Sequence, residues 1–202
     1  DVIYRSGAKD TDLICVSGNL GAAYCGLQLL EREKSVYYMQ LQEARKKNKD
    51  AVVDFQPDFS GREYLLERQL QPEARGDILK TLRQAGVRPT SMIDISDGLS
   101  SEIMHICKES DTGCRLFEKE IPIDYQTAVM AEEMNMNLST CALNGGEDYE
   151  LLFTCPIGDY EKVKELDDIR IIGHITKKEL GTLLVTRDGQ EFPLKAQGWQ
   201  HA

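Results

Sequence analysis

Residues 91–102 read SMIDISDGLSSE, which predicts a strand, a tight turn and the start of a helix. The apolar run before Ser96 is typical of a buried strand, and this strand carries Asp94. After the turn, apolar residues at helical spacing form one stripe: Leu99, Ile103, Ile106 and Cys107. The segment is therefore one strand–turn–helix unit with acidic and hydroxyl side chains at its turn.

The same reading on both sides of this unit predicts alternating strands and helices. Strands are expected at residues 13–16, 113–117, 149–155, 169–172 and 182–185, and Asp188-Gly189 predicts a hairpin turn. Helices are expected from Ala22, over residues 63–70, from Pro72 to Gly86, over 128–136 and over 160–166. Such alternation favours an α/β or α+β class, and the basic end of the first helix, residues 43–50, is expected to be solvated.

Composition limits the function classes. The 202 residues carry 24 Lys and Arg against 34 Asp and Glu, a net charge of −10, which argues against a nucleic-acid binder. No apolar run exceeds four residues, so we expect no membrane-spanning helix and no signal-peptide core. The six cysteines show no C-x-x-C spacing, so we expect reduced core residues of a cytoplasmic protein.

The turn after the strand is the first candidate site. Asp94 and Asp97 lie three residues apart at a strand end, where two carboxylates can converge on one hard cation. The free N–H groups of the following helix suit a phosphate oxygen. The alternative is that Ser96 or Asp97 only caps the helix, although an unpaired Asp94 inside an apolar strand would be costly.

Two further segments have weaker signals. Residues 144–150 read NGGEDYE, in which the glycines allow a ligand close to the backbone and the acids need compensation, or the segment is a solvated turn. Residues 17–21, SGNLG, lack the lysine of a phosphate-binding loop, so a plain strand-to-helix turn is expected. Arg5 is either a phosphate clamp or a surface residue, and Trp199 either stacks on a flat ring or pins the tail.

Taken in order, five segments resemble the thiamine-monophosphate kinase family. They are RSGA at 5–8, VSGNLG at 16–21, IDISDGL at 93–99, LNGGEDYEL at 143–151 and GWQH at 198–201. The family belongs to the superfamily of aminoimidazole ribonucleotide synthase. The resemblance implies that superfamily's C-terminal fold, a mixed β-sheet covered by helices.

The resemblance also implies an activity, a cofactor and partners. Family members transfer the γ-phosphate of ATP to thiamine monophosphate with Mg²⁺, giving thiamine diphosphate. The chain begins at Asp1, so we expect residues 1–12 to be a stub from a missing N-terminal ATP-binding domain and residues 13–202 to be the C-terminal domain. The missing domain would carry most metal ligands and the homodimer interface, so these residues alone are expected to show little or no activity.

By match to the family motifs, each candidate residue has an implied role. Asp94 and Asp97 are expected to bind the metal, Arg5 and Ser96 the ATP, and Glu147, Asp148 and Trp199 the substrate. No catalytic nucleophile is assigned, because the substrate's own phosphate attacks. Two alternatives stay open: another ATP-using member of the superfamily, and a non-catalytic binding or assembly domain.

Overall fold

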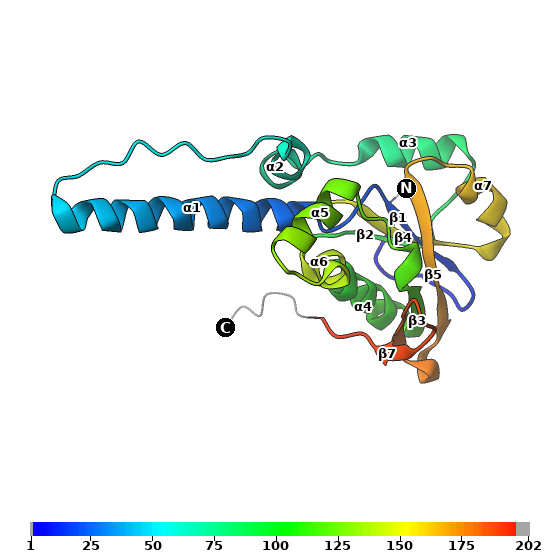
Figure 1. Cartoon of the computed structure of the whole chain (residues 1–202). Coiled ribbons are helices and arrows are strands. Elements are labelled where there is room, and N and C mark those ends of the chain that lie inside the picture. Colours follow the sequence, from blue (N-terminus) through cyan, green and yellow to red (C-terminus); the bar gives the residue numbers. More distant parts are fainter. Residues whose placement is uncertain (1, 197–202) are drawn as a thin grey trace.

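A seven-stranded sheet organises residues 2–196, which are the residues that the computed structural model describes (Figure 1). Its strands are β1 (Leu13–Ser17), β2 (Ser91–Asp94), β3 (Thr112–Phe117), β4 (Leu151–Cys155), β5 (Ile169–Lys177), β6 (Thr182–Val185) and β7 (Glu191–Pro193). The strand order is β2-β4-β1-β5-β3-β6-β7, and all pairs are antiparallel except β3 with β6. The predicted mixed sheet is thus confirmed.

Helices cover both faces of this sheet. They are α1 (Ala22–Lys47), α2 (Glu63–Leu70), α3 (Gly76–Gln84), α4 (Leu99–Ser110), α5 (Tyr125–Glu133), α6 (Leu138–Asn144) and α7 (Tyr160–Lys164). Three short 3₁₀ turns follow strands: Glu118–Glu120 after β3, Ile157–Asp159 after β4 and Lys178–Leu180 after β5. None of the helices in residues 2–196 has the length and apolar character that crossing a bilayer requires.

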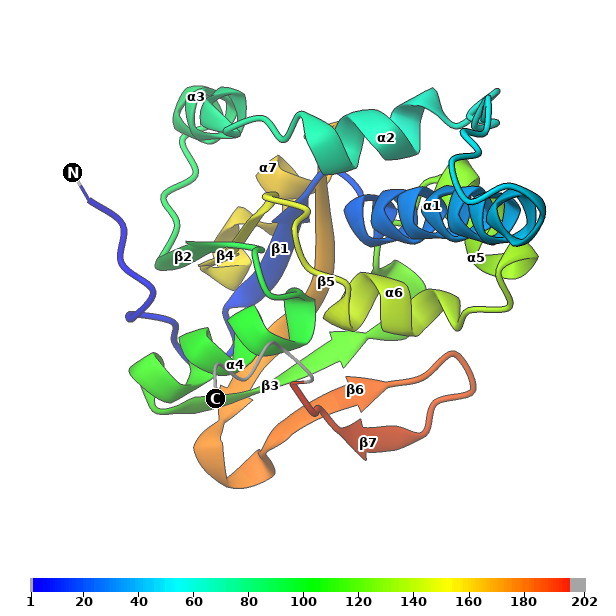
Figure 2. The same cartoon turned by 90° about the vertical axis from the view of Figure 1, so that its left-hand side faces the viewer.

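Strand β1, in the middle of the sheet, is fully buried because each face of the sheet has its own helical cover there. Ile14 of β1 packs in one cluster with Ile103 of α4, whereas Cys15 packs in another with Leu82 of α3 and Phe153 of β4. Figure 2 shows α3 and α7 on one side of the sheet and α4 on the other. Two covered faces explain why β1 is an unbroken apolar run instead of an alternating one. All six cysteines are buried free thiols, as expected.

Helix α1 leaves the body of the molecule (Figure 1). Its first turns are buried, but beyond Leu29 only Leu41 is buried. Residues 48–62 return beside the helix, where the ring of Phe55 lies 5.7 Å from that of Tyr37. The basic run at residues 45–47 ends the helix in solvent, which confirms the prediction of a solvated helix end.

Two predicted helix boundaries were wrong for identifiable reasons. Pro72 does not open a helix, because α2 ends at Leu70 and α3 begins only at Gly76. A proline restricts the residue before it to extended backbone, so Pro72 separates the helices. The helix predicted over 128–136 begins earlier, because Asp124 accepts from the N–H of Gln126 at 2.8 Å. The helix that follows it, α6, was missed.

Candidate functional site

The acidic turn lies at the end of edge strand β2 and the start of α4. Asp94 and Asp97 are both exposed, whereas Ile95 between them is buried. The prediction that Asp94 lies inside a buried strand was therefore wrong, because Asp94 is the last residue of β2, at the strand end on the edge of the sheet. Neither Ser96 nor Asp97 caps α4, whose N-cap is Gly98 at φ 110° without a side-chain hydrogen bond.

A buried glutamate holds this turn from inside. Glu102, in the first turn of α4, is 3% exposed. Its Oε1 accepts from the N–H of Asp97 at 3.0 Å and from the Oγ of Ser96 at 3.3 Å. In the sequence, Glu102 is recognisable only as an acid in the first turn of the predicted helix, and its contacts with the turn were not predicted. Glu102 thus holds the backbone of the turn, while Asp97 itself is exposed.

The second predicted segment lies directly against the first. The N–H of Glu147 donates to the carbonyl of Ser96 at 2.7 Å, and the N–H of Tyr149 donates to that of Ile95 at 2.9 Å. Gly146 allows this contact, since its φ is +70° and a Cβ would lie 2.6 Å from the Ser96 oxygen. Two segments about fifty residues apart in sequence thus form one surface.

Four polar side chains share this surface. Glu147 is exposed, and its Oε2 accepts from the Tyr149 hydroxyl at 3.0 Å. This hydrogen bond raises the pKa of Tyr149, and the charges of Glu147, Asp94 and Asp97 raise it further. The charges of all three carboxylates therefore act on the Tyr149 hydroxyl, so the four side chains share one electrostatic environment.

Asp148, predicted to contact substrate, points away from that surface. It is 2% exposed, and its carboxylate accepts from the N–H groups of Gly21 at 2.8 Å and Ala23 at 3.3 Å, at the start of α1. Burial raises its pKa to about 6. A carboxylate thus occupies the helix N-terminus where a phosphate would otherwise bind. Residues 17–21 form the strand-to-helix turn expected between β1 and α1.

Two predicted residues remain, Arg5 and Trp199. Arg5 is exposed, and the preceding carbonyl, of Tyr4, accepts from the N–H of Met92 at 2.9 Å, so Arg5 lies along the free edge of β2. Trp199 lies outside the described residues.

The donor set fits a divalent cation only in part. Asp94 and Asp97 are exposed oxygen donors, and neither forms an ion pair with a described lysine or arginine. Carboxylate oxygens suit Mg²⁺, which is commonly held by one or two carboxylates and substrate phosphates. Residues 2–196 contain no cluster of three or more Asp, Glu, His or Cys arranged to hold a metal. These residues can contribute to a cation site but do not complete one.

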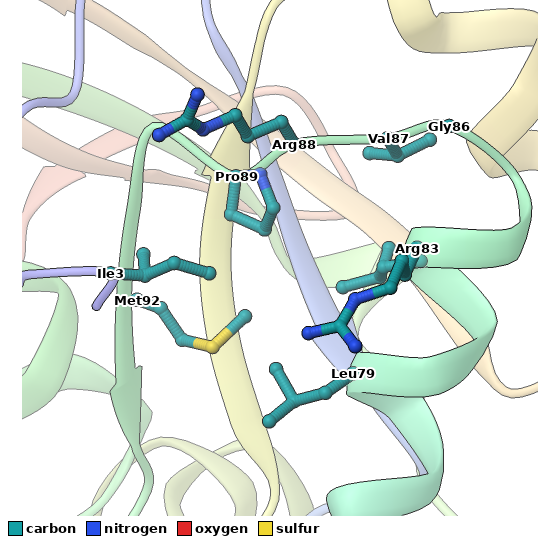
Figure 3. Close-up of a pocket in the computed structure, with 9 residues that line it drawn as sticks. Ile3, Leu79, Arg83, Gly86, Val87, Arg88, Pro89 and Met92 are labelled. Atoms are coloured by element: carbon teal, nitrogen blue, oxygen red, sulfur yellow. The ribbon is translucent and has the colours of Figure 1, made fainter. Parts of the chain in front are cut away.

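One apolar pocket of the described chain is separate from these residues. It has a volume of about 550 Å³ and lies between α3 and β2 (Figure 3). Apolar side chains such as Leu79 and Met92 line it, together with Arg83. No predicted site residue lines it. The candidate site is therefore an exposed acidic surface on the described chain.

Comparisons with known proteins agree with the family motifs. No protein-family model matches the chain. Thiamine-monophosphate kinases of Aquifex aeolicus (strain VF5) and Escherichia coli (strain K12) are 30% and 32% identical to it, each over 98% of the chain and 54% of their own length. The chain is related to thiamine-monophosphate kinase. The predicted resemblance to the C-terminal part of this family is confirmed.

Solved structures extend this relationship to the fold. A thiamine-monophosphate kinase structure described as AaThiL complexed with AMPPCP and TMP matches with a TM-score of 0.72 at 30% identity, over 99% of this chain and 54% of that one. The hydrogenase maturation protein HypE of E. coli matches with a TM-score of 0.66 at 15% identity, over 98% of this chain and 54% of that one, which shows the fold alone. The chain spans about half the length of the thiamine-monophosphate kinases it matches.

Proposed function

We propose that this chain belongs to an enzyme that phosphorylates thiamine monophosphate with ATP, giving thiamine diphosphate. The names of its relatives support this reaction, and so does a similar structure described with AMPPCP and TMP. The observation that carries the proposal is the pairing of residues 144–150 with the turn at 94–97, which gathers Asp94, Asp97 and Glu147 on one exposed surface.

The roles are those that the family motifs imply for the matching residues. We assign Asp94 and Asp97 to the metal, Arg5 and Ser96 to ATP, and Glu147 to the substrate. All three carboxylates face solvent without a described cation, which is the state expected of groups that receive a charged ligand. Trp199 keeps its implied substrate role as a prediction outside the described residues.

The proposed chemistry needs alignment more than activation. The attacking group is the substrate's own phosphate, so the chain requires no activated Ser or Cys. Mg²⁺, when bound, would neutralise charge on the phosphates. The chain's residues hold the reactants: a guanidinium at Arg5 suits phosphate oxygens, and an acid at Glu147 suits a cationic or hydrogen-bonding part of the substrate.

The test changes one metal-facing carboxylate in the protein at its full encoded length. Asp97→Asn is expected to lower kcat by more than about 10-fold and to raise the Mg²⁺ concentration needed for half-maximal rate, because even an indirect metal partner is worth about 10- to 100-fold. Asp111→Asn is the matched control, since Asp111 is an exposed acid at the other end of α4 that pairs with Lys178. An unchanged Mg²⁺ dependence in Asp97→Asn would refute the metal role.

A further inference from the structure

The loop at residues 147–150 alternates between solvent and interior. Glu147 is exposed and Tyr149 half-buried, while Asp148 and Glu150 are 2% and 1% exposed. The two outward residues have left-handed backbone, with φ of 60° at Glu147 and 51° at Tyr149. Non-glycine residues keep this conformation only where their surroundings impose it. Something inside the domain therefore has to hold the loop.

The buried carboxylate of Glu150 is one anchor. It forms an ion pair with Arg68 Nη1 at 2.9 Å and accepts hydrogen bonds from Arg75 Nη1 at 2.5 Å and from Ser17 Oγ at 2.5 Å. The approach is close, because a Cβ at Gly18 would lie 2.2 Å from a Glu150 oxygen. A carboxylate buried this deeply is tolerated only with such partners. Both of its oxygens are therefore committed to the interior and do not reach the candidate site.

Arg68 of α2 holds the loop at a second point as well. While its Nη1 pairs with Glu150, its Nη2 donates to the backbone carbonyl of Asp148 at 2.9 Å. The same Nη2 lies 3.4 Å from the carbonyl of Asn19, in the turn before α1. A single planar guanidinium thus ties a side chain and a backbone group of the loop together, which an ammonium group cannot reproduce.

The helix that carries Arg68 is itself firmly placed. Figures 1 and 2 show α2 against the start of α1. A Cβ at Gly26 of α1 would lie 2.2 Å from the carbonyl of Leu65 in α2, so the two backbones are in direct contact. Arg68 is only 19% exposed and reaches the loop from this fixed position. The position of α2 therefore fixes Arg68, and Arg68 in turn fixes the loop at residues 147–150.

We propose that Arg68 is a positioning residue for the reaction proposed above, on which this inference rests. It contacts neither substrate nor metal. It fixes Asp148 and Glu150 so that the two residues alternating with them, Glu147 and Tyr149, stay hydrogen-bonded to the turn at Ser96. The direction of the Glu147 carboxylate is thereby set from α2, on the inner side of the loop.

Arg68→Gln and Arg68→Lys test this, with Arg62→Gln as the matched control. Arg62, at the start of α2, makes a two-bond ion pair with Glu133 and does not touch the loop. The first measurement needs no activity: backbone amide exchange at Glu147 and Tyr149. We expect about 10-fold faster exchange at these two amides in both Arg68 variants and no change in β1 and β5, because loss of an anchor opens a segment locally.

The second measurement is kinetic and uses the protein at its full encoded length. Misplacement by about 1 Å can cost on the order of 100-fold, so we expect kcat/KM for thiamine monophosphate to fall by about 10- to 100-fold in Arg68→Gln. The KM for Mg-ATP is expected to keep its wild-type value. For Arg68→Lys we expect a kcat/KM between those of the wild type and Arg68→Gln. A lysine can keep the ion pair with Glu150 but not the hydrogen bond to the Asp148 carbonyl.

The outcomes separate the two proposals. If the wild-type protein does not phosphorylate thiamine monophosphate, the proposed function fails. If the wild type is active and the Arg68 variants match Arg62→Gln in amide exchange and in kcat/KM for thiamine monophosphate, the positioning role is refuted. An equal loss toward both substrates with a uniform rise in amide exchange would also refute it, because Arg68 would then only stabilise the fold.

Discussion

The buried carboxylate of Asp148 should make the stability of this protein depend on pH in an unusual direction. Asp148 accepts two N–H bonds at the start of α1 and is almost fully buried. Burial raises its pKa from 3.8 to about 6. The folded chain therefore keeps a proton on Asp148 up to about pH 6, whereas the unfolded chain loses it near pH 4.

The magnitude follows from the size of this shift. A raised pKa of about two units corresponds to about 3 kcal/mol, at about 1.4 kcal/mol per unit. Because the folded state binds the proton more tightly, this contribution is fully present below pH 3.8 and is lost as pH rises through about 6. Asp148→Asn removes the titrating carboxyl group, so the free energy of unfolding of the variant should not contain this pH-dependent decrease.

The measurement is the free energy of urea unfolding between pH 3.5 and about 7.5 for the wild type and the variant. The asparagine keeps an acceptor for Gly21 but loses the bond to Ala23, which shifts the variant by a pH-independent amount. Only the slope of the difference is diagnostic. Asp167→Asn, at an exposed acid, is the control and should follow the wild-type curve. A flat difference between wild type and Asp148→Asn, or one of opposite sign, would refute the reasoning.

Three more substitutions probe ion pairs and packing in the domain. Glu150→Gln should lower the free energy of unfolding by about 3–5 kcal/mol, because it breaks a buried ion pair from one side, and a loss below 1 kcal/mol in urea would contradict this. Gly26→Ala places a Cβ 2.2 Å from the Leu65 carbonyl, so the free energy of unfolding should fall by about 1–3 kcal/mol or more. Thermal unfolding measures this, and an unchanged Tm would contradict the close α1–α2 contact. Arg115→Ala removes an ion pair with Glu191 whose side chains are 24% and 44% exposed. The loss in free energy of unfolding should stay below about 1 kcal/mol and should shrink in high salt. A larger loss that does not depend on salt would contradict this.

Local rules predicted much of this fold correctly. The eight-residue α2 matches the helix predicted over residues 63–70, and the turn at Asp188-Gly189 joins β6 to β7 as expected. The family motifs also predicted the mixed sheet. The helix and the turn depend on neighbours a few residues apart, which a single sequence displays directly, whereas the sheet was predicted from the resemblance to the family. The acids of the candidate site were likewise visible as residue types at the ends of strands.

Local rules could not predict which acids of the site are buried. The sequence LNGGEDYEL shows three acids close together, but not that Glu147 faces solvent while Asp148 and Glu150 are buried. That division depends on Gly21, 127 residues away from Asp148, and on Arg68, which is 80 residues away. A carboxylate is buried only where distant donors meet it, and only the folded chain brings them together. The sequence by itself therefore determined which chemical groups are present and most of the local elements, whereas the tertiary structure decided which of those groups reach a ligand.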